Sequence, residues 1–159
     1  MERCTGHAAR TALRGALAGG AATVAMSGVI AIGRALGLFR TSPPQEITAA
    51  ATQEATGWPP AATTAFRAGG LSAHLLYGMA CGSLFSGLRQ CGPRLPRQPL
   101  GLGFGLLVWG ASYLGLMPAL RLYPWPNQDT PGRVATMILA HLVFGASLAE
   151  VDKRLALRR

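Results

Sequence analysis

Two histidines occur inside long uncharged segments, and each begins a row of small residues. The small residues follow at four-residue intervals and share the helical face of the histidine: Gly78 and Gly82 after His74, and Gly145 and Ala149 after His141. Small residues at this spacing allow two helix backbones to approach closely. We therefore expect both faces to point into a helical bundle, with these four small residues as its packing positions.

Imidazoles inside apolar segments could perform several kinds of chemistry. A neutral ring can bind a metal ion or a haem iron, and the ring takes up a proton near pH 6.5. A metal usually needs a third ligand, and no carboxylate or cysteine pair is expected at this depth. Haem would need a wide cavity, which the small-residue faces disfavour. We predict no metal, no cofactor and no catalytic residue, with interhelical hydrogen bonding ranked first and proton sensing second.

Four uncharged segments must position these side chains: residues 15–33, 68–88, 98–120 and 134–149. About 20 helical residues cross the hydrocarbon core of a bilayer. The first three segments are long enough, whereas the fourth needs snorkelling side chains or a thinner bilayer. A soluble bundle would carry charges along its outer helix faces, yet only 13% of this chain is charged. The sequence predicts an all-α fold, a four-transmembrane-helix bundle, as a single domain over residues 1–159.

The depth of each polar residue follows from its distance to the arginine that bounds the same segment. Several polar residues lie seven or eight positions from such an arginine, which corresponds to about 10–12 Å along a helix. We expect them to form one polar layer across the bundle: Ser27, His74, Ser112, Tyr113 and His141. Hydrogen bonds between spans contribute about 0.6–2 kcal/mol each and select which helices meet.

Basic residues predict the orientation of the bundle. With four spans, the side that holds both termini and the middle loop carries ten of the 15 basic residues, and the other side carries five. The positive-inside rule therefore places both termini in the cytoplasm. The net charge of +9 follows from these span ends and does not indicate nucleic acid. The expected partners are the bilayer and either a second copy or another membrane protein.

The longest loop contains a short helix over residues 43–56. Ser42 would cap it, Pro43 would occupy its first position, and Gly57 would end it. We expect this helix at the outer interface, with Trp58 at headgroup depth. The carboxylates outside the spans and at their ends should be solvated: Glu46, Glu54, Asp129 and Glu150.

The two halves of the chain resemble each other. Residues 73–78 (AHLLYG) match residues 140–145 (AHLVFG) in the second and fourth segments. Two helical hairpins repeated in the same orientation would be related by an axis along the membrane normal.

These motifs, with residues 43–48 (PPQEIT) and 109–115 (WGASYLG), resemble the YagU-like small bacterial inner-membrane proteins. The resemblance implies an integral inner-membrane location, no assigned chemistry and, for some relatives, a link to acid tolerance. We expect a structural or interaction role with a protonatable histidine layer, and no enzyme activity. A small transporter or channel subunit, and a metal- or haem-binding redox protein, are the alternatives.

Overall fold

The computed structural model describes residues 2–39, 43–58, 64–91, 95–116, 119 and 125–157, and all regular structure among them is helical. This confirms the all-α prediction for the described part of the chain. The elements are α1 (Glu2–Ala35), α2 (Pro43–Thr56), α3 (Thr64–Cys91), α4 (Arg97–Trp109), η1 (Gly110–Leu116), η2 (Pro126–Gln128) and α6 (Pro131–Leu157).

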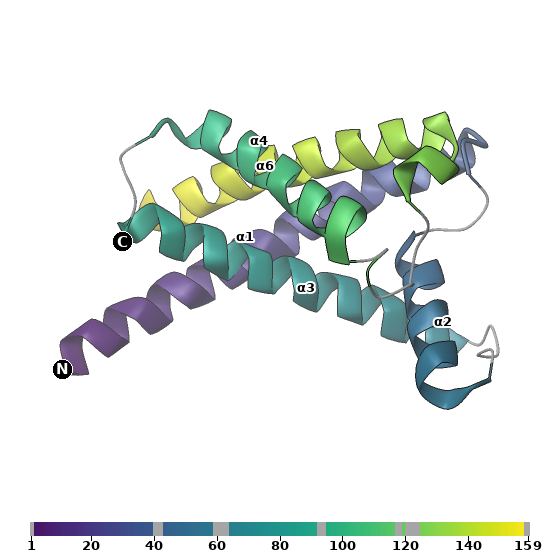
Figure 1. Ribbon diagram of the computed structural model, residues 1–159. Helices are drawn as coiled ribbons and strands as arrows, with labels where there is room; N and C mark the ends of the chain where they lie inside the picture. Colours follow the sequence, from purple (N-terminus) through teal and green to yellow (C-terminus); the bar gives the residue numbers. More distant parts are fainter. Residues whose placement is uncertain are drawn as a thin grey trace.

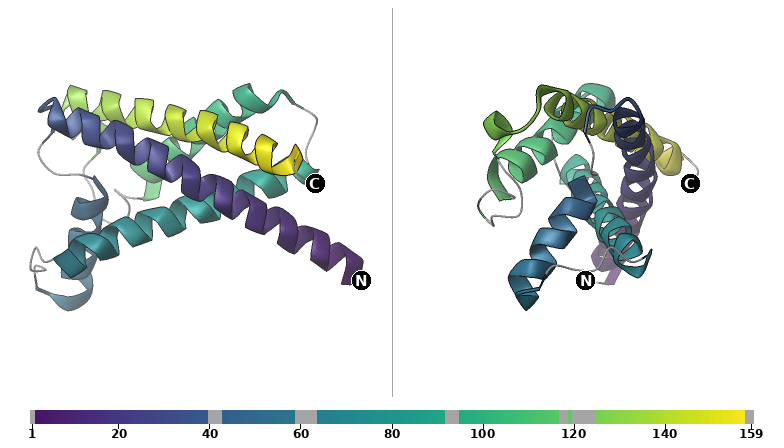
Figure 2. Two further views of the ribbon diagram at one scale, coloured as in Figure 1. Left: turned by 180° about the vertical axis from the view of Figure 1, so that it is seen from behind. Right: turned by 90° about the vertical axis from the view of Figure 1, so that its right-hand side faces the viewer.

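The long helices run between two ends of the molecule. Both termini lie at one end, together with the last turn of α3 and the first turn of α4, whereas α2 lies at the other (Figure 1). Helix α1 passes obliquely between α3 and α6, and α4 packs on α6 (Figure 2). Helices α3 and α4 meet through side chains, such as Phe85 and Phe104 with ring centroids 5.3 Å apart.

Three helices are long and apolar enough to cross a membrane: Ala8–Ala35, Phe66–Gln90 and Pro131–Leu157. They contain three of the four predicted segments. Large apolar side chains are exposed along them, including Leu17, Val24, Leu76 and Leu139. Exposed apolar surface of this extent is typical of a lipid-facing helix.

The third predicted segment, 98–120, is not one α-helix. Helix α4 ends at Trp109, and the chain continues as the π-helix η1 from Gly110 to Leu116. Glycine has a low α-helical propensity and tolerates a change of helical pitch. Gly110 and Gly115 lie on either side of Tyr113 within this segment. Short π-helical segments occur frequently at functional sites.

The fourth predicted segment was too short. Helix α6 has 27 residues, because it continues through the charged residues after position 149. One of these, Asp152, is buried and paired with arginines from other helices. Counting uncharged residues underestimates a helix whose charges are neutralised inside the protein.

Helix α2 forms where the sequence predicted it. It ends before Gly57, which has φ of +74° and accepts the left-handed conformation that closes a helix. The proposed cap, Ser42, lies outside the described residues. Trp58 is exposed, and its placement at headgroup depth stays a prediction.

Glycines bring the helices into backbone contact at two places. At the first place, Gly19 of α1 lies against Gly78 and Gly82 of α3. At the second, Gly101 of α4 lies against Gly145 of α6. A methyl group added at Gly19, Gly82, Gly101 or Gly145 would collide with the facing backbone, and one added at Gly78 would collide with the side chain of Thr23. The small-residue faces of α3 and α6 therefore point into the molecule, and Ala149 is buried as well. The relation of the two halves as a repeat stays a prediction.

Candidate functional site: a cavity lined by two histidines

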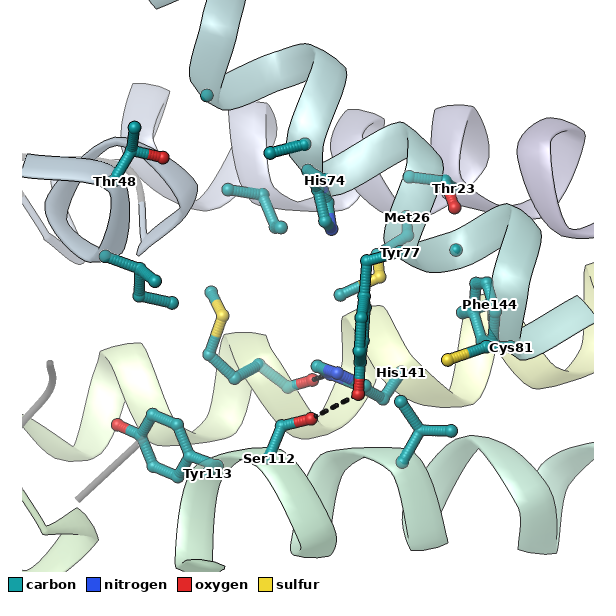
Figure 3. Close-up of a pocket in the computed structure, with 17 residues that line it drawn as sticks. Thr23, Met26, Thr48, His74, Tyr77, Cys81, Ser112, Tyr113, His141 and Phe144 are labelled. Carbon is teal, nitrogen blue, oxygen red and sulfur yellow. Dashed lines mark hydrogen bonds between the residues drawn. The ribbon is translucent and has the colours of Figure 1, made fainter. Parts of the chain in front are cut away.

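A cavity of about 270 Å³ lies between the helices, near the end that carries α2 (Figure 3). Its wall is largely apolar, with Met26, Ile30, Val108, Met137 and Phe144 among its residues. The polar side chains that reach it come from α1, α2, α3, η1 and α6: Thr23, Thr48, His74, Tyr77, Ser112, Tyr113 and His141. Packing of four helices around a few polar groups is a common setting for a ligand site.

The structure brings four of the five residues of the expected polar layer to this cavity. His74, Ser112, Tyr113 and His141 line it, whereas Ser27 does not. Ser27 lies on α1 between residues that do line the cavity, but on a different face of the helix. The face of α1 that lines the cavity carries Thr23, Met26 and Ile30. The number of positions from an arginine predicts how deep a residue lies along its helix, but not which way its side chain points.

His141 is held by its own helix. Its Nδ1 lies 2.8 Å from the carbonyl oxygen of Met137, one turn earlier on α6. A carbonyl oxygen can only accept, so Nδ1 carries the hydrogen and donates it. The Nε2 atom of the neutral ring is then a free acceptor for a ligand or a proton.

His74 lies on α3 and faces the same cavity (Figure 3). In the part of the chain that the structure describes, neither imidazole forms a hydrogen bond to another helix. The first-ranked expectation for these histidines, that they tie helices together, is therefore not met there. Their position on the wall of a cavity is a different arrangement from a hydrogen-bonded layer.

Tyr77 and Ser112 join α3 to η1 across one side of the cavity. The two hydroxyl oxygens are 2.8 Å apart. Tyr77 was missed as a site residue, although it follows His74 by three positions and so lies on the same helical face. Tyr113 stacks on Trp109 at a centroid distance of 5.8 Å and donates its hydroxyl hydrogen to Asp129.

Arg133 at the start of α6 fixes α2 over this end. Its guanidinium lies 3.0 Å from a carboxylate oxygen of Glu46, 3.6 Å from Asp129, and 5.6 Å from the ring centre of Phe39. The prediction of solvation was wrong for Asp129, whose side chain is 5% exposed, whereas Glu46 stays 29% exposed while it pairs with the same arginine. This pairing holds Ile47 and Thr48 of α2 against the cavity.

A buried carboxylate lies at the opposite end and was missed. The Asp152 side chain is 1% exposed, and its Oδ1 accepts hydrogen bonds from Arg14 Nε at 2.8 Å and Ser86 Oγ at 2.6 Å. Asp152 follows Ala149 by three positions, so it extends the small-residue face of α6. That spacing could have indicated from the sequence that Asp152 faces the other helices. Glu150, by contrast, pairs with Arg154 at the surface.

The donor set of the cavity bears on metal binding. The described residues contain no group of three or more His, Cys, Asp or Glu side chains placed to hold a metal ion. Cys81 also lines the cavity, as a free thiol. The polar groups in the wall are thus suited to hydrogen bonding with a neutral molecule.

Apolar helices of membrane-spanning length, joined through glycine contacts, characterise this chain as a helical membrane protein. It belongs to a family of unknown function, DUF6789, whose sequence profile matches residues 9–159. No curated protein and no solved structure matches the chain.

Proposed function

We propose that this chain is a four-pass protein of the bacterial inner membrane, with both termini in the cytoplasm, whose cavity binds a small lipophilic molecule with a carbonyl or hydroxyl group. The fourth crossing would be made by α4 continued by η1, which together extend from Arg97 to Leu116. The observation that carries the proposal is the histidine-lined cavity of about 270 Å³.

The size and the wall of the cavity support a ligand of one or two rings. A cavity of about 150 Å³ lined by apolar side chains is large enough to bind benzene. Small-molecule pockets typically combine an apolar wall with a few convergent polar groups. Here the large apolar side chains come mainly from α1, α4 and α6, and the polar groups come from α1, α2, α3, η1 and α6.

The hydrogen-bonding capacity of the wall defines the polar part of the ligand. His141 Nε2 accepts a hydrogen from a ligand hydroxyl, since Nδ1 is already engaged with Met137. The Tyr77 and Ser112 hydroxyls share one hydrogen between their oxygens, so one of them retains a hydrogen for a ligand carbonyl. The wall can therefore form a hydrogen bond with either a hydroxyl or a carbonyl group of the ligand.

The approach to the cavity would be lateral, between α3 and η1. Tyr77 is 45% exposed, and its contact with Ser112 is the described hydrogen bond that closes this side. In a bilayer that side faces acyl chains. A ligand dissolved in the membrane would enter by separating the two hydroxyls.

Proton sensing by the two histidines is a second candidate function. Among the described residues, those that line the cavity include both imidazoles and no carboxylate, so protonation of both rings would place two unbalanced positive charges in an apolar space. The resemblance to YagU-like proteins, some of which are linked to acid tolerance, favours the same role. A transporter or channel would require a wet path, and an apolar wall offers little support for one.

The ligand proposal is tested with 1-naphthol, two fused rings with one hydroxyl, added to protein in lipid nanodiscs. Uptake by empty nanodiscs is subtracted. We expect saturable binding at one site. Ala73→Phe, which fills the cavity from α3, should abolish it. The double variant His74→Gln/His141→Gln should weaken it by about tenfold, which corresponds to the loss of a hydrogen bond.

Ser27→Ala is the matched control, because Ser27 is a polar residue at the same depth that does not line the cavity. Its binding should equal that of the wild type. Uptake no greater than by empty nanodiscs, or unchanged binding by Ala73→Phe, would contradict the proposal. A fall in naphthol affinity between pH 7 and pH 5 that disappears in the double histidine variant would support the proton-sensing role.

A further inference from the structure

The end of the molecule opposite the cavity collects an excess of positive charge around Asp152. Arg14 of α1 and Arg97 of α4 lie 2.8 and 3.6 Å from the two oxygens of this carboxylate. Arg89 of α3 lies within electrostatic range of Asp152 and of both arginines. Two guanidinium groups thus pair with one carboxylate and a third lies near them, which gives a local charge of about +2.

Two of these arginines have unused donors in buried positions. Arg89 Nη1 and Arg97 Nη1 are both inaccessible to solvent and form no hydrogen bond to any described residue. The 3.6 Å separation of Arg97 Nη1 from Asp152 is an ion-pair distance and too long for a hydrogen bond. A buried charged N–H group without an acceptor is costly, so these atoms call for a ligand.

The other acidic residues whose side chains the structure describes do not supply that acceptor. Glu46 and Asp129 pair with Arg133 at the far end, next to the cavity, and Glu54 is exposed on α2 at that same end. Glu150 pairs with Arg154. Only Glu2 is left among the six acidic residues, and its side chain lies outside the described part of the structure.

We propose that this cluster, defined by Arg14, Arg89, Arg97 and Asp152, is a binding site for a phosphate group. Guanidinium groups bind phosphate oxygens through paired N–H donors. Asp152 holds Arg14 in place, and Arg89 and Arg97 present the free donors. The first turn of α4 adds to the site, because its N-cap residue, Pro96, makes no side-chain hydrogen bond to the backbone amides of Arg97 and Gln98 that follow it.

Two sources could supply this phosphate: the headgroup of an anionic phospholipid, or inorganic phosphate from solution. Arg89 lies in the last turn of α3, and Arg97 begins α4. In a membrane-spanning arrangement, helix ends of this kind lie at headgroup depth, where anionic lipids attract arginine. Both sources share the same chemistry at the site and differ in whether an acyl chain accompanies it.

The experiment measures lipid and phosphate binding to the full-length protein. Wild-type protein in phosphatidylcholine nanodiscs is compared with protein in nanodiscs containing one-fifth phosphatidylglycerol, and the thermal midpoint is recorded in each. Native mass spectrometry counts retained phosphatidylglycerol. A separate arm titrates inorganic phosphate into the phosphatidylcholine sample, with chloride at equal ionic strength as the reference.

We expect phosphatidylglycerol to be retained and to raise the thermal midpoint of the wild type. Arg89→Gln and Arg97→Gln should each reduce phosphatidylglycerol affinity by about tenfold, since each removes a charge-assisted hydrogen bond. Lys153→Gln is the matched control. Lys153 is exposed and lies next to Asp152 in the sequence, so the substitution removes one positive charge from outside the cluster. It should leave the affinity within about twofold of wild type.

A midpoint that rises with inorganic phosphate, and not with phosphatidylglycerol, would identify free phosphate as the source and support the site. If neither raises the wild-type midpoint above its reference, the proposal is overturned, whatever the variants do. It is also overturned if Lys153→Gln loses as much affinity as the two cluster variants. If a glutamine variant does not fold, Arg89→Lys or Arg97→Lys replaces it in the same affinity measurement.

Discussion

The two ends of this helical assembly handle polar groups in opposite ways. Near α2, the helices leave a cavity, and the polar groups that face it are neutral imidazoles and hydroxyls. At the other end, the helices converge on the buried carboxylate of Asp152, which pairs with Arg14 and Arg97 and accepts a hydrogen bond from Ser86. The cavity end is thus suited to admitting a neutral molecule, and the charged end to joining helices.

The difference between the ends originates in the glycine contacts that lie between them. Gly19 with Gly78 and Gly82, and Gly101 with Gly145, bring helix backbones together in two places. From there α1 and α3 diverge toward the end that carries α2 (Figure 2), where side chains such as Tyr77 and Met137 line the cavity. A close contact in the middle with bulkier residues beyond it is enough to produce a hollow at one end.

The largest expected effect comes from placing a large side chain in the glycine contact between α1 and α3. Gly19→Leu places a side chain where the Gly78 carbonyl lies, so α1 and α3 must separate and both ends lose their geometry. We expect a loss of stability of more than about 4 kcal/mol. Unfolding in detergent followed by circular dichroism measures it.

The matched control is Gly28→Leu on the same helix, where an added carbon meets no atom within 4 Å. It should be as stable as the wild type. Equal destabilisation by both substitutions would show that helix propensity or lipid contact, and not close backbone packing, accounts for the effect.

The second effect acts on the charged end alone. Asp152→Asn leaves Arg14 and Arg97 without the carboxylate that they share. Removing one partner of a buried ion pair costs about 3 kcal/mol, and we expect a loss of that size in the same unfolding measurement. Binding of 1-naphthol at the other end should persist under folding conditions.

Glu150→Gln is the control for Asp152→Asn, since it removes a carboxylate of the same helix that pairs at the surface. Little change in stability is expected from it. If Asp152→Asn were as harmless as Glu150→Gln, the buried carboxylate would not be holding the helices together.

The smallest effect concerns α2 at the cavity end. Glu46→Gln weakens the bond that fixes α2 to Arg133, while Asp129 still pairs with that arginine. We expect a loss of about 1 kcal/mol, visible as faster hydrogen exchange in α2. Glu54→Gln, an exposed acidic residue of the same helix, should not alter exchange, and a similar increase there would contradict docking through Glu46.

Hydrophobicity and small-residue spacing predicted much of the fold from the sequence. Three of the predicted segments lie in helices of membrane-spanning length, and α2 begins and ends where Pro43 and Gly57 indicated. The change to a π-helix after Trp109 could not be read from hydropathy, because α- and π-helical segments have the same apolar composition.

The candidate site was predicted in part. His74 and His141 were found because an ionisable residue in an apolar segment is rare. Tyr77 lay on the same face and was passed over, and Asp152 was missed because its charge suggested solvent. Which arginines would surround Asp152 depended on three helices that are distant from it in sequence.

The sequence by itself determined that the chain is helical, where its apolar segments lie and which faces carry small residues, since these follow from composition and from the period of the helix. The tertiary structure decided that the histidines line a cavity instead of bonding helix to helix, and that Asp152 is buried among arginines. Those outcomes depend on how far apart helix backbones settle. Side chains from distant parts of the chain set that separation together, and no local pattern contains it.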